Sequence, residues 1–153
     1  MYQQIVVGTD GSEGGNIAVD AAIELARLTG ATLHIVHAYK VMGSYQLAAA
    51  AEVGVVPNVV ESNEAVLAHG RRICAAVVAR AGGVGVRAEA HCVNDDAADA
   101  LIKVATDAKA DLVVVGNRGM SGARRFVLGS VPNKVSHHCP TSLLVVDTSQ
   151  ARP

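Results

Sequence analysis

The sequence predicts a single-domain α/β fold: a five-stranded parallel sheet in the order 3-2-1-4-5 with helices on both faces. Short apolar runs alternate with helix-length amphipathic segments, the pattern of parallel strands joined by crossover helices. A length of 153 residues suits one domain. The apolar residues are mainly Ala and Val, with one Phe and no Trp, which favours helices packed closely on a sheet. We expect residues 1–147 to form the domain and 148–153 a flexible tail.

The N-terminal half contains two apolar runs, each followed by a helical pattern. The first strand covers residues 4–8 and the second covers 33–38. The helix between them ends at Gly30 and is expected to bury one face, formed by Ile17, Ala21, Leu25 and Leu28. Residues 40–58 form either a mobile flap or a short helix. The long helix that follows ends at Gly82-Gly83 and buries a stripe formed by Val66, Gly70, Ile73, Val77 and Ala81.

The third strand alternates in polarity, which predicts cover on one face and a place near the sheet edge. Its covered residues are expected to be Val86, Ala88, Ala90 and Cys92. Asn94 or Asp95 is expected to cap the next helix, which turns Leu101, Ala105 and Ala108 inward. On its outer face we expect an i,i+4 ladder of charged residues, namely Asp99, Lys103 and Asp107.

The first and fourth strands lack such alternation and should be central. With the third strand at an edge, the order 3-2-1-4-5 follows, and the chain changes direction between strands one and four. Ligands bind at such switch points in open α/β sheets. The turn after strand one and Gly116 after strand four should therefore meet at one crevice.

A glycine-rich segment follows the fourth strand, an apolar run over 111–115. It begins with Gly116-Asn117-Arg118-Gly119 and, nine residues later, reaches Gly129-Ser130-Val131. Glycines let the backbone approach an anion, and the first amides of a helix supply donors and partial positive charge. The segment therefore predicts a phosphate site, with helix capping and turning as the simpler alternative role of its glycines.

The fifth strand, Leu143 to Val146, is apolar on both faces and should be covered. A homodimer through this strand is one explanation, and burial within the monomer is the other. The 13 basic and 14 acidic residues nearly cancel, which argues against nucleic acid as a partner. No apolar stretch reaches membrane length, so we expect no membrane partner. Three cysteines without a C-x-x-C pair favour a reducing compartment, the cytoplasm.

Gly116, Gly119, Gly129 and Ser130 fill every fixed position of the pattern G-x2-G-x9-G-[ST]. In this pattern, and in the turn from Val7 to Ser12, the chain resembles the ATP-binding subgroup of the universal stress protein family over nearly its whole length. The resemblance implies a Rossmann-like fold of the HUP superfamily, a homodimer joined through the last strand, and ATP across strands one and four. Asn94 departs from the family, where many relatives have Gly.

The resemblance also implies the residues of the site. It puts adenine near Gly8, Thr9, Asp10 and Ala38, and the nucleoside beside Val115 and Gly116. It gives the phosphates to four residues with backbone amides or a hydroxyl: Gly119, Gly129, Ser130 and Val131. Arg118 is expected to neutralise phosphate charge, whereas Arg124 and Arg125 fit a solvated loop slightly better. Asp10 fits a turn or cap role equally well.

The chain lacks the P-loop motif and shows no obvious general base. We expect structural roles for all six histidines and no metal site, with His34 and His37 on opposite strand faces and His69 and His91 isolated on the surface. The leading hypothesis is a nucleotide-dependent regulatory module, not an enzyme, that binds ATP or another adenine nucleotide. The rivals are a slow ATPase or phosphoryl or nucleotidyl transferase, in which Asp10 holds Mg²⁺, and a stress chaperone or dimeric adaptor with incidental nucleotide.

Overall fold

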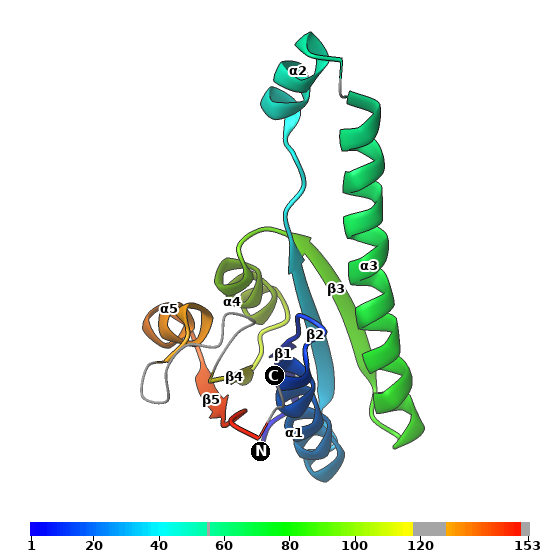
Figure 1. The fold of residues 1–153 in the computed structure, drawn as a ribbon. Helices are drawn as coiled ribbons and strands as arrows, with labels where there is room; N and C mark the ends of the chain where they lie inside the picture. The colour runs from blue at the N-terminus through cyan, green and yellow to red at the C-terminus, as the bar shows by residue number, and fades with distance from the viewer. Residues whose placement is uncertain (55, 118–127, 151–153) are drawn as a thin grey trace.

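The computed structural model describes residues 1–54, 56–117 and 128–150. The parallel sheet has five strands in the order β3-β2-β1-β4-β5, which confirms the predicted order (Figure 1). The strands, from the N-terminus, are β1 (Gln4–Gly8), β2 (Thr32–Tyr39), β3 (Ala88–Asn94), β4 (Leu112–Gly116) and β5 (Ser142–Val146). β1 pairs with both β2 and β4, so it is the central strand of the sheet.

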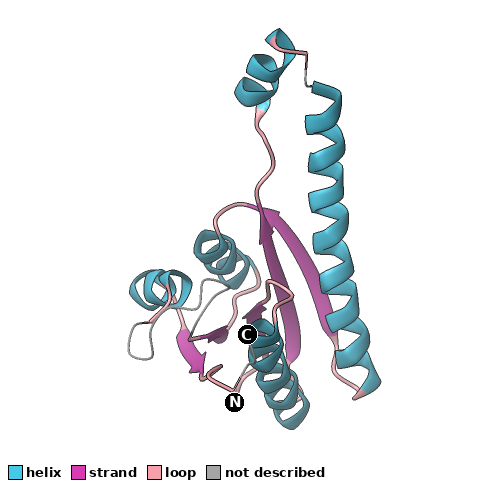
Figure 2. Ribbon diagram, in the orientation of Figure 1, coloured by secondary structure: helices cyan, strands magenta, loops and turns pink. Residues whose placement is uncertain are grey.

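Helices cover both faces of the sheet (Figure 2). They are α1 (Glu13–Thr29), α2 (Ser44–Glu52), α3 (Val56–Gly83), α4 (Ala97–Asp107) and α5 (Ser130–His138). α1 and α3 pack on one face, and α4 and α5 pack on the other. The alternatives for residues 40–58 resolve in favour of helix, since α2 lies there. α2 and the start of α3 extend beyond the sheet (Figure 1). None of the helices in the described ranges is both long and apolar enough to cross a bilayer.

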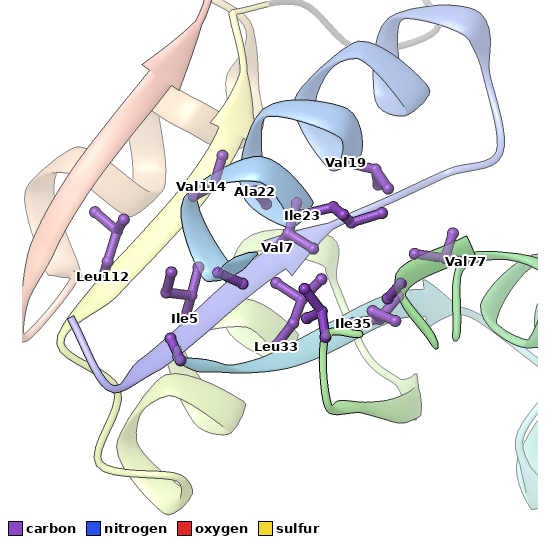
Figure 3. Packing of buried hydrophobic residues seen from close by; sticks show 14 of the residues in the cluster. Ile5, Val7, Val19, Ala22, Ile23, Leu33, Ile35, Val77, Leu112 and Val114 are labelled. Atoms are coloured by element: carbon purple, nitrogen blue, oxygen red, sulfur yellow. The ribbon is translucent and has the colours of Figure 1, made fainter. Parts of the chain in front are cut away.

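The core consists of two layers separated by β1 and β4. Ile5 and Val7 of β1 pack with Val114 of β4 and the inner face of α1 (Figure 3). Val6, between them, points to the other layer and packs with α4. All three β1 residues are fully buried, as expected for a parallel strand covered on both faces. The predicted central strands are therefore confirmed.

The buried face of α1 differs from the predicted one. Its buried residues are Ala18, Val19, Ala22, Ile23 and Ala26. Leu28, expected inside, is 65% exposed. Alanines spaced four residues apart bring this helix close to the sheet, and the larger Ile17 and Leu25 lie only at the margin of the contact. Gly30 ends the helix in the left-handed region at φ 73°, as predicted.

β3 is an edge strand, as predicted, but the alternation inferred for it is wrong at Ala90, which is exposed. Cys92 packs against the layer formed with α3, and Val93 packs against the layer formed with α4. Both faces of β3 are thus covered near its carboxyl end. α3 and α4 reach over this end from opposite sides, and the residue pattern of the strand does not reveal such cover.

The cap of α4 is neither Asn94 nor Asp95. Asp96 is the N-cap, and its Oδ1 accepts a hydrogen bond from the Ala98 amide at 3.1 Å. Asn94 instead ends β3, and its Oδ1 accepts from the Val41 amide at 3.3 Å. Residue type alone allows Asn94 or Asp95 as the cap, but β3 runs further than its polarity pattern indicated.

The inner and outer faces of α4 agree with the sequence only in part. Leu101 and Ala105 are buried, whereas Ala108 is the half-buried C-cap. The predicted pair between Lys103 and Asp107 forms at 2.7 Å. Asp99 does not join this ladder, because its carboxylate pairs with Lys134 of α5 at 2.7 Å. Asp99 therefore helps to hold the two helices of this face together.

Cys74 of α3 is a core residue, as predicted, with 1% of its surface exposed. Its Sγ lies 3.7 Å from the Sγ of Cys92 on β3. Burial is the main cause that raises the pKa of Cys74 to about 12, and the neighbouring Cys92 thiol is the second. Because the thiolate is the reactive form, this thiol should be inert at neutral pH.

We predict that iodoacetamide at pH 8 modifies Cys74 at least about tenfold more slowly than the half-buried Cys139 in the native protein. Peptide mass spectrometry over a time course measures both rates. In denaturant the two rates should converge, and equal rates in the native state would contradict the burial of Cys74.

Candidate functional site

A cavity of about 330 Å³ lies at the carboxyl ends of β1 and β4, at the predicted switch point. Eight predicted site residues line it: Gly8, Thr9, Asp10, Ala38, Val115, Gly116, Ser130 and Val131. The cavity also has lining residues that sequence reasoning missed: Gly15, Val36, Ala97, Leu101 and Pro132. Its volume falls in the range of small-molecule sites.

The first wall is the turn after β1. The Thr9 amide donates to the Val36 carbonyl at 2.9 Å, and the Thr9 carbonyl lies 3.0 Å from Nδ1 of His37. Thr9 is 7% exposed, so its backbone is held firmly against β2. His37 in turn packs on Gly70 of α3, where a Cβ would lie 2.6 Å from the ring. His37 is thus a support for the cavity wall, fitted against a glycine of the long helix.

Asp10 both lines the cavity and orders the start of α1. Its Oδ1 accepts from the Ser12 amide at 2.9 Å and from the Ser12 hydroxyl at 2.5 Å. Ser12 Oγ is the N-cap of α1 and accepts from the Gly15 amide at 3.0 Å. The two roles left open for Asp10 are therefore compatible, because it supports the capping residue while lining the cavity.

The second wall is anchored by Asn117, directly after β4, a residue that sequence reasoning did not single out. Its backbone amide donates to the Val146 carbonyl at 2.8 Å. Its side-chain Oδ1 accepts from the Thr148 amide at 3.0 Å and hydroxyl at 2.7 Å. Asn117 thus joins the end of β4 to the chain after β5, and Thr148, assigned to the tail, is buried. The sequence signal for Asn117 was its place as a polar residue directly after Gly116, the first glycine of the motif.

Gly129 differs from its predicted role. Its amide donates to the Asn117 carbonyl at 3.0 Å, which closes the loop between β4 and α5. Gly129 is also the N-cap of α5, without a side-chain cap. Ser130 and Val131 form the first turn and line the cavity. First-turn amides of a helix have no intrahelical partner and carry partial positive charge, so this end of the cavity suits an anion.

Two of the five missed residues come from α4. Ala97 and Leu101 lie one helical turn apart, and α4 begins at the same sheet edge as the cavity. A Cβ on Gly8 would lie 3.2 Å from Leu101 Cδ1, so the glycine leaves room for this side chain. The signal that could have identified Ala97 and Leu101 was topological, because every helix that follows a strand starts at this edge of the sheet. Arg118, Gly119, Arg124 and Arg125 lie outside the described residues.

The chain also matches known proteins. Residues 1–147 match the model of the universal stress protein family. The chain belongs to this family. Universal stress protein YxiE of Bacillus subtilis is 32% identical over 150 residues, which cover 95% of this chain and 99% of the relative. Universal stress protein Rv1636 of Mycobacterium tuberculosis is 33% identical over 149 residues, covering 97% and 98%. The predicted family membership is confirmed.

Solved structures agree with this assignment. A crystal structure of a universal stress protein in complex with cAMP is 34% identical and has a TM-score of 0.69 to this chain. The match covers 97% of this chain and 98% of that one. The architecture and the sequence therefore point to the same family.

We predict opposite effects for two adjacent glycines of α1. In Gly15→Ala the new Cβ would lie 2.6 Å from Asp10 Oδ1, which two hydrogen bonds hold in place. We expect a loss of about 1–3 kcal/mol in unfolding free energy. In Gly14→Ala the nearest atom is at 3.6 Å, an ordinary contact, so stability should be unchanged or rise by up to about 1 kcal/mol. Thermal and urea unfolding measure both, and equal behaviour would contradict the packing of Asp10.

Proposed function

We propose that this universal stress protein binds ATP in the cavity between β1 and β4 and acts as a nucleotide-dependent regulatory module. One observation carries the proposal: a cavity with apolar walls ends at the uncapped first turn of α5. An adenosine group needs flat apolar contact with a few polar partners, and a phosphate tail needs amide donors. One end of the cavity is apolar and suits the adenosine group, and the other end meets the amides of α5 and suits the phosphates.

The base and ribose belong at the apolar end. Val36 and Ala38 of β2 and Val115 of β4 contribute aliphatic surface on either side of β1. Thr9 and Asp10 contribute polar groups to the same lining. This arrangement supports an adenine ring between the ends of β1 and β2, with Val115 and Gly116 beside the nucleoside.

The phosphates belong at the start of α5. The amides of Ser130 and Val131 and the Ser130 hydroxyl supply donors there. We assign Arg118 and Gly119, from the same motif, to the outer phosphates. Mg²⁺ would enter together with the nucleotide and would neutralise phosphate charge, because it prefers oxygen ligands.

Binding, rather than turnover, is the proposed output. Asp10 is the one ionisable side chain among the described residues that line the cavity, and its Oδ1 already accepts two hydrogen bonds from Ser12. A carboxylate engaged in this way is a poor general base. A regulatory module of this kind acts through the difference in affinity of a partner protein for the loaded and empty forms.

The ligand class has independent support from the relative crystallised with cAMP, which is 34% identical to this chain. That protein holds an adenine nucleotide, and the same base site would serve ATP, AMP or cAMP. The choice among them depends on the phosphate end of the cavity. We assign ATP because the glycine motif continues beyond Gly116 to two further glycines and Ser130.

We also propose a cytoplasmic homodimer joined through β5. β5 is the last strand of the sheet, and Leu143 to Val146 remain only half-buried although both helical layers reach them. Pairing with the same strand of a second copy would continue the sheet around a two-fold axis. Light scattering at micromolar concentration should give the mass of two chains, and the mass of one chain would contradict the dimer.

Calorimetry tests the binding site directly. We expect saturable ATP binding at one site per chain in the presence of Mg²⁺, with weaker binding of cAMP. Ala38→Phe should weaken ATP binding at least about tenfold, because the ring would occupy the base site. Ala90→Phe is the matched control: it places the same ring on the exposed part of β3 and should leave affinity unchanged.

Two results would contradict the proposed function. If Ala38→Phe and Ala90→Phe bind ATP with equal affinity, the cavity is not the nucleotide site. ATP hydrolysis at ordinary enzyme rates, abolished by Asp10→Ala while binding persists, would favour the enzyme over the regulatory module.

A further inference from the structure

Two histidines that the sequence separates by 57 positions lie together on the sheet. His34 Nδ1 of β2 is 3.0 Å from His91 Nε2 of β3. The expectation that His91 is isolated on the surface is therefore wrong. His69, also expected to be isolated, has its ring centroid 6.5 Å from that of His37. His34 and His37 lie on opposite faces of β2, as predicted, because three positions separate them on the strand, and the His37 ring packs on Gly70 of α3.

A carboxylate completes the cluster around His34. Glu89 stands opposite His34 in the β2–β3 register, and His91 is two residues further along β3 on the same face. Glu89 Oε2 lies 3.7 Å from His34 Nδ1. The three ligand atoms lie within 4.8 Å of one another. Ligands of a tetrahedral zinc ion, at ~2.0–2.1 Å from the metal, are roughly 3.2–3.5 Å apart, so small side-chain rotations suffice.

Gln4 of β1 prepares His34 for coordination. Its Oε1 lies 2.8 Å from His34 Nε2 on the side away from the cluster. An amide oxygen only accepts hydrogen bonds, so Nε2 carries the proton and Nδ1 presents a lone pair to His91 and Glu89. Metal-bound histidines characteristically donate their second ring N–H to an oxygen in this way.

From this geometry we propose that His34, Glu89 and His91 form a Zn²⁺ site on the outer part of the sheet. Two imidazoles and one carboxylate are ligands that zinc prefers. In the metal-free chain Nε2 of His91 donates its proton to Nδ1 of His34. Zinc needs the lone pair of His91 Nε2, so on binding His91 shifts to the tautomer that carries its proton on Nδ1. His34 is 7% exposed at its side chain and Glu89 is 58% exposed, so the fourth coordination position faces solvent.

The site is independent of the proposed nucleotide site. None of Gln4, His34, Glu89 and His91 is among the described residues that line the cavity. The metal links the edge strand β3 to β2, which makes it a clip between strands. Loss of zinc binding and loss of nucleotide binding are therefore separable in experiment.

Equilibrium dialysis with Zn²⁺ alone, followed by elemental analysis, tests the proposal on the full chain. We expect one zinc ion per wild-type chain and a rise in thermal midpoint with added zinc. His91→Asn and Glu89→Gln should each weaken binding at least about tenfold and abolish the zinc-dependent rise. Both residues lie on the edge strand and are partly exposed, so both variants should fold.

Matched controls and a spectroscopic readout complete the test. His138→Asn on α5 and Glu64→Gln on α3 make the same changes at exposed positions and should keep wild-type zinc affinity. Co²⁺ in place of zinc should give ligand-field absorption that His91→Asn removes. The proposal is overturned if the wild type binds no zinc, if folded His91→Asn and Glu89→Gln bind it normally, or if the controls lose it equally. ATP affinity should be unchanged in all four variants.

Discussion

The parallel pairing of β1 with β4 is the constraint on which the rest of the structure depends. Ile5, Val6 and Val7 stand opposite Leu112, Val113 and Val114, and all six are buried. After β1 the chain continues to α1 on one face of the sheet, and after β4 it continues to α5 on the other face. The two connections diverge, and side chains from β2, α4 and α5 close the space between them into a cavity.

The ends of β1 and β4 are held in place because polar atoms of Thr9 and Asn117 form hydrogen bonds within the protein. Thr9 is held by Val36 and His37, and Asn117 is held by Val146 and Thr148. These bonds join the end of β1 to β2, and the end of β4 to the chain beyond β5. A ligand that enters between them meets a preformed site, which lowers the ordering cost of binding.

Sequence reasoning recovered the strand order because it rests on a simple property, the lack of polar alternation in buried central strands. It also found the glycine turns and the residues next to strand ends, which share one edge of the sheet. It missed Ala97 and Leu101, since small apolar residues on a helix look alike whether they meet the core or a cavity. The N-cap of α4 was misplaced for a related reason: three polar residues stand in a row, and only the length of β3 selects Asp96.

The histidine cluster shows a further limit of sequence patterns. His34 and His91 meet because β2 and β3 pair in one register, and a shift by one residue would turn His91 to the other face. Register depends on the packing of α3 and α4 against both strands, which local polarity does not encode. By contrast, the opposite orientation of His34 and His37 follows from strand geometry alone and was predictable.

Hydrogen exchange of backbone amides, with and without saturating ATP and Mg²⁺, tests the central claim most directly. If the nucleotide lies between the diverging connections, protection should rise in the turn after β1 and in the first turn of α5. It should stay constant in β3 and in the part of α3 that extends beyond the sheet. Protection confined to β3 or α3, or no change anywhere, would contradict it.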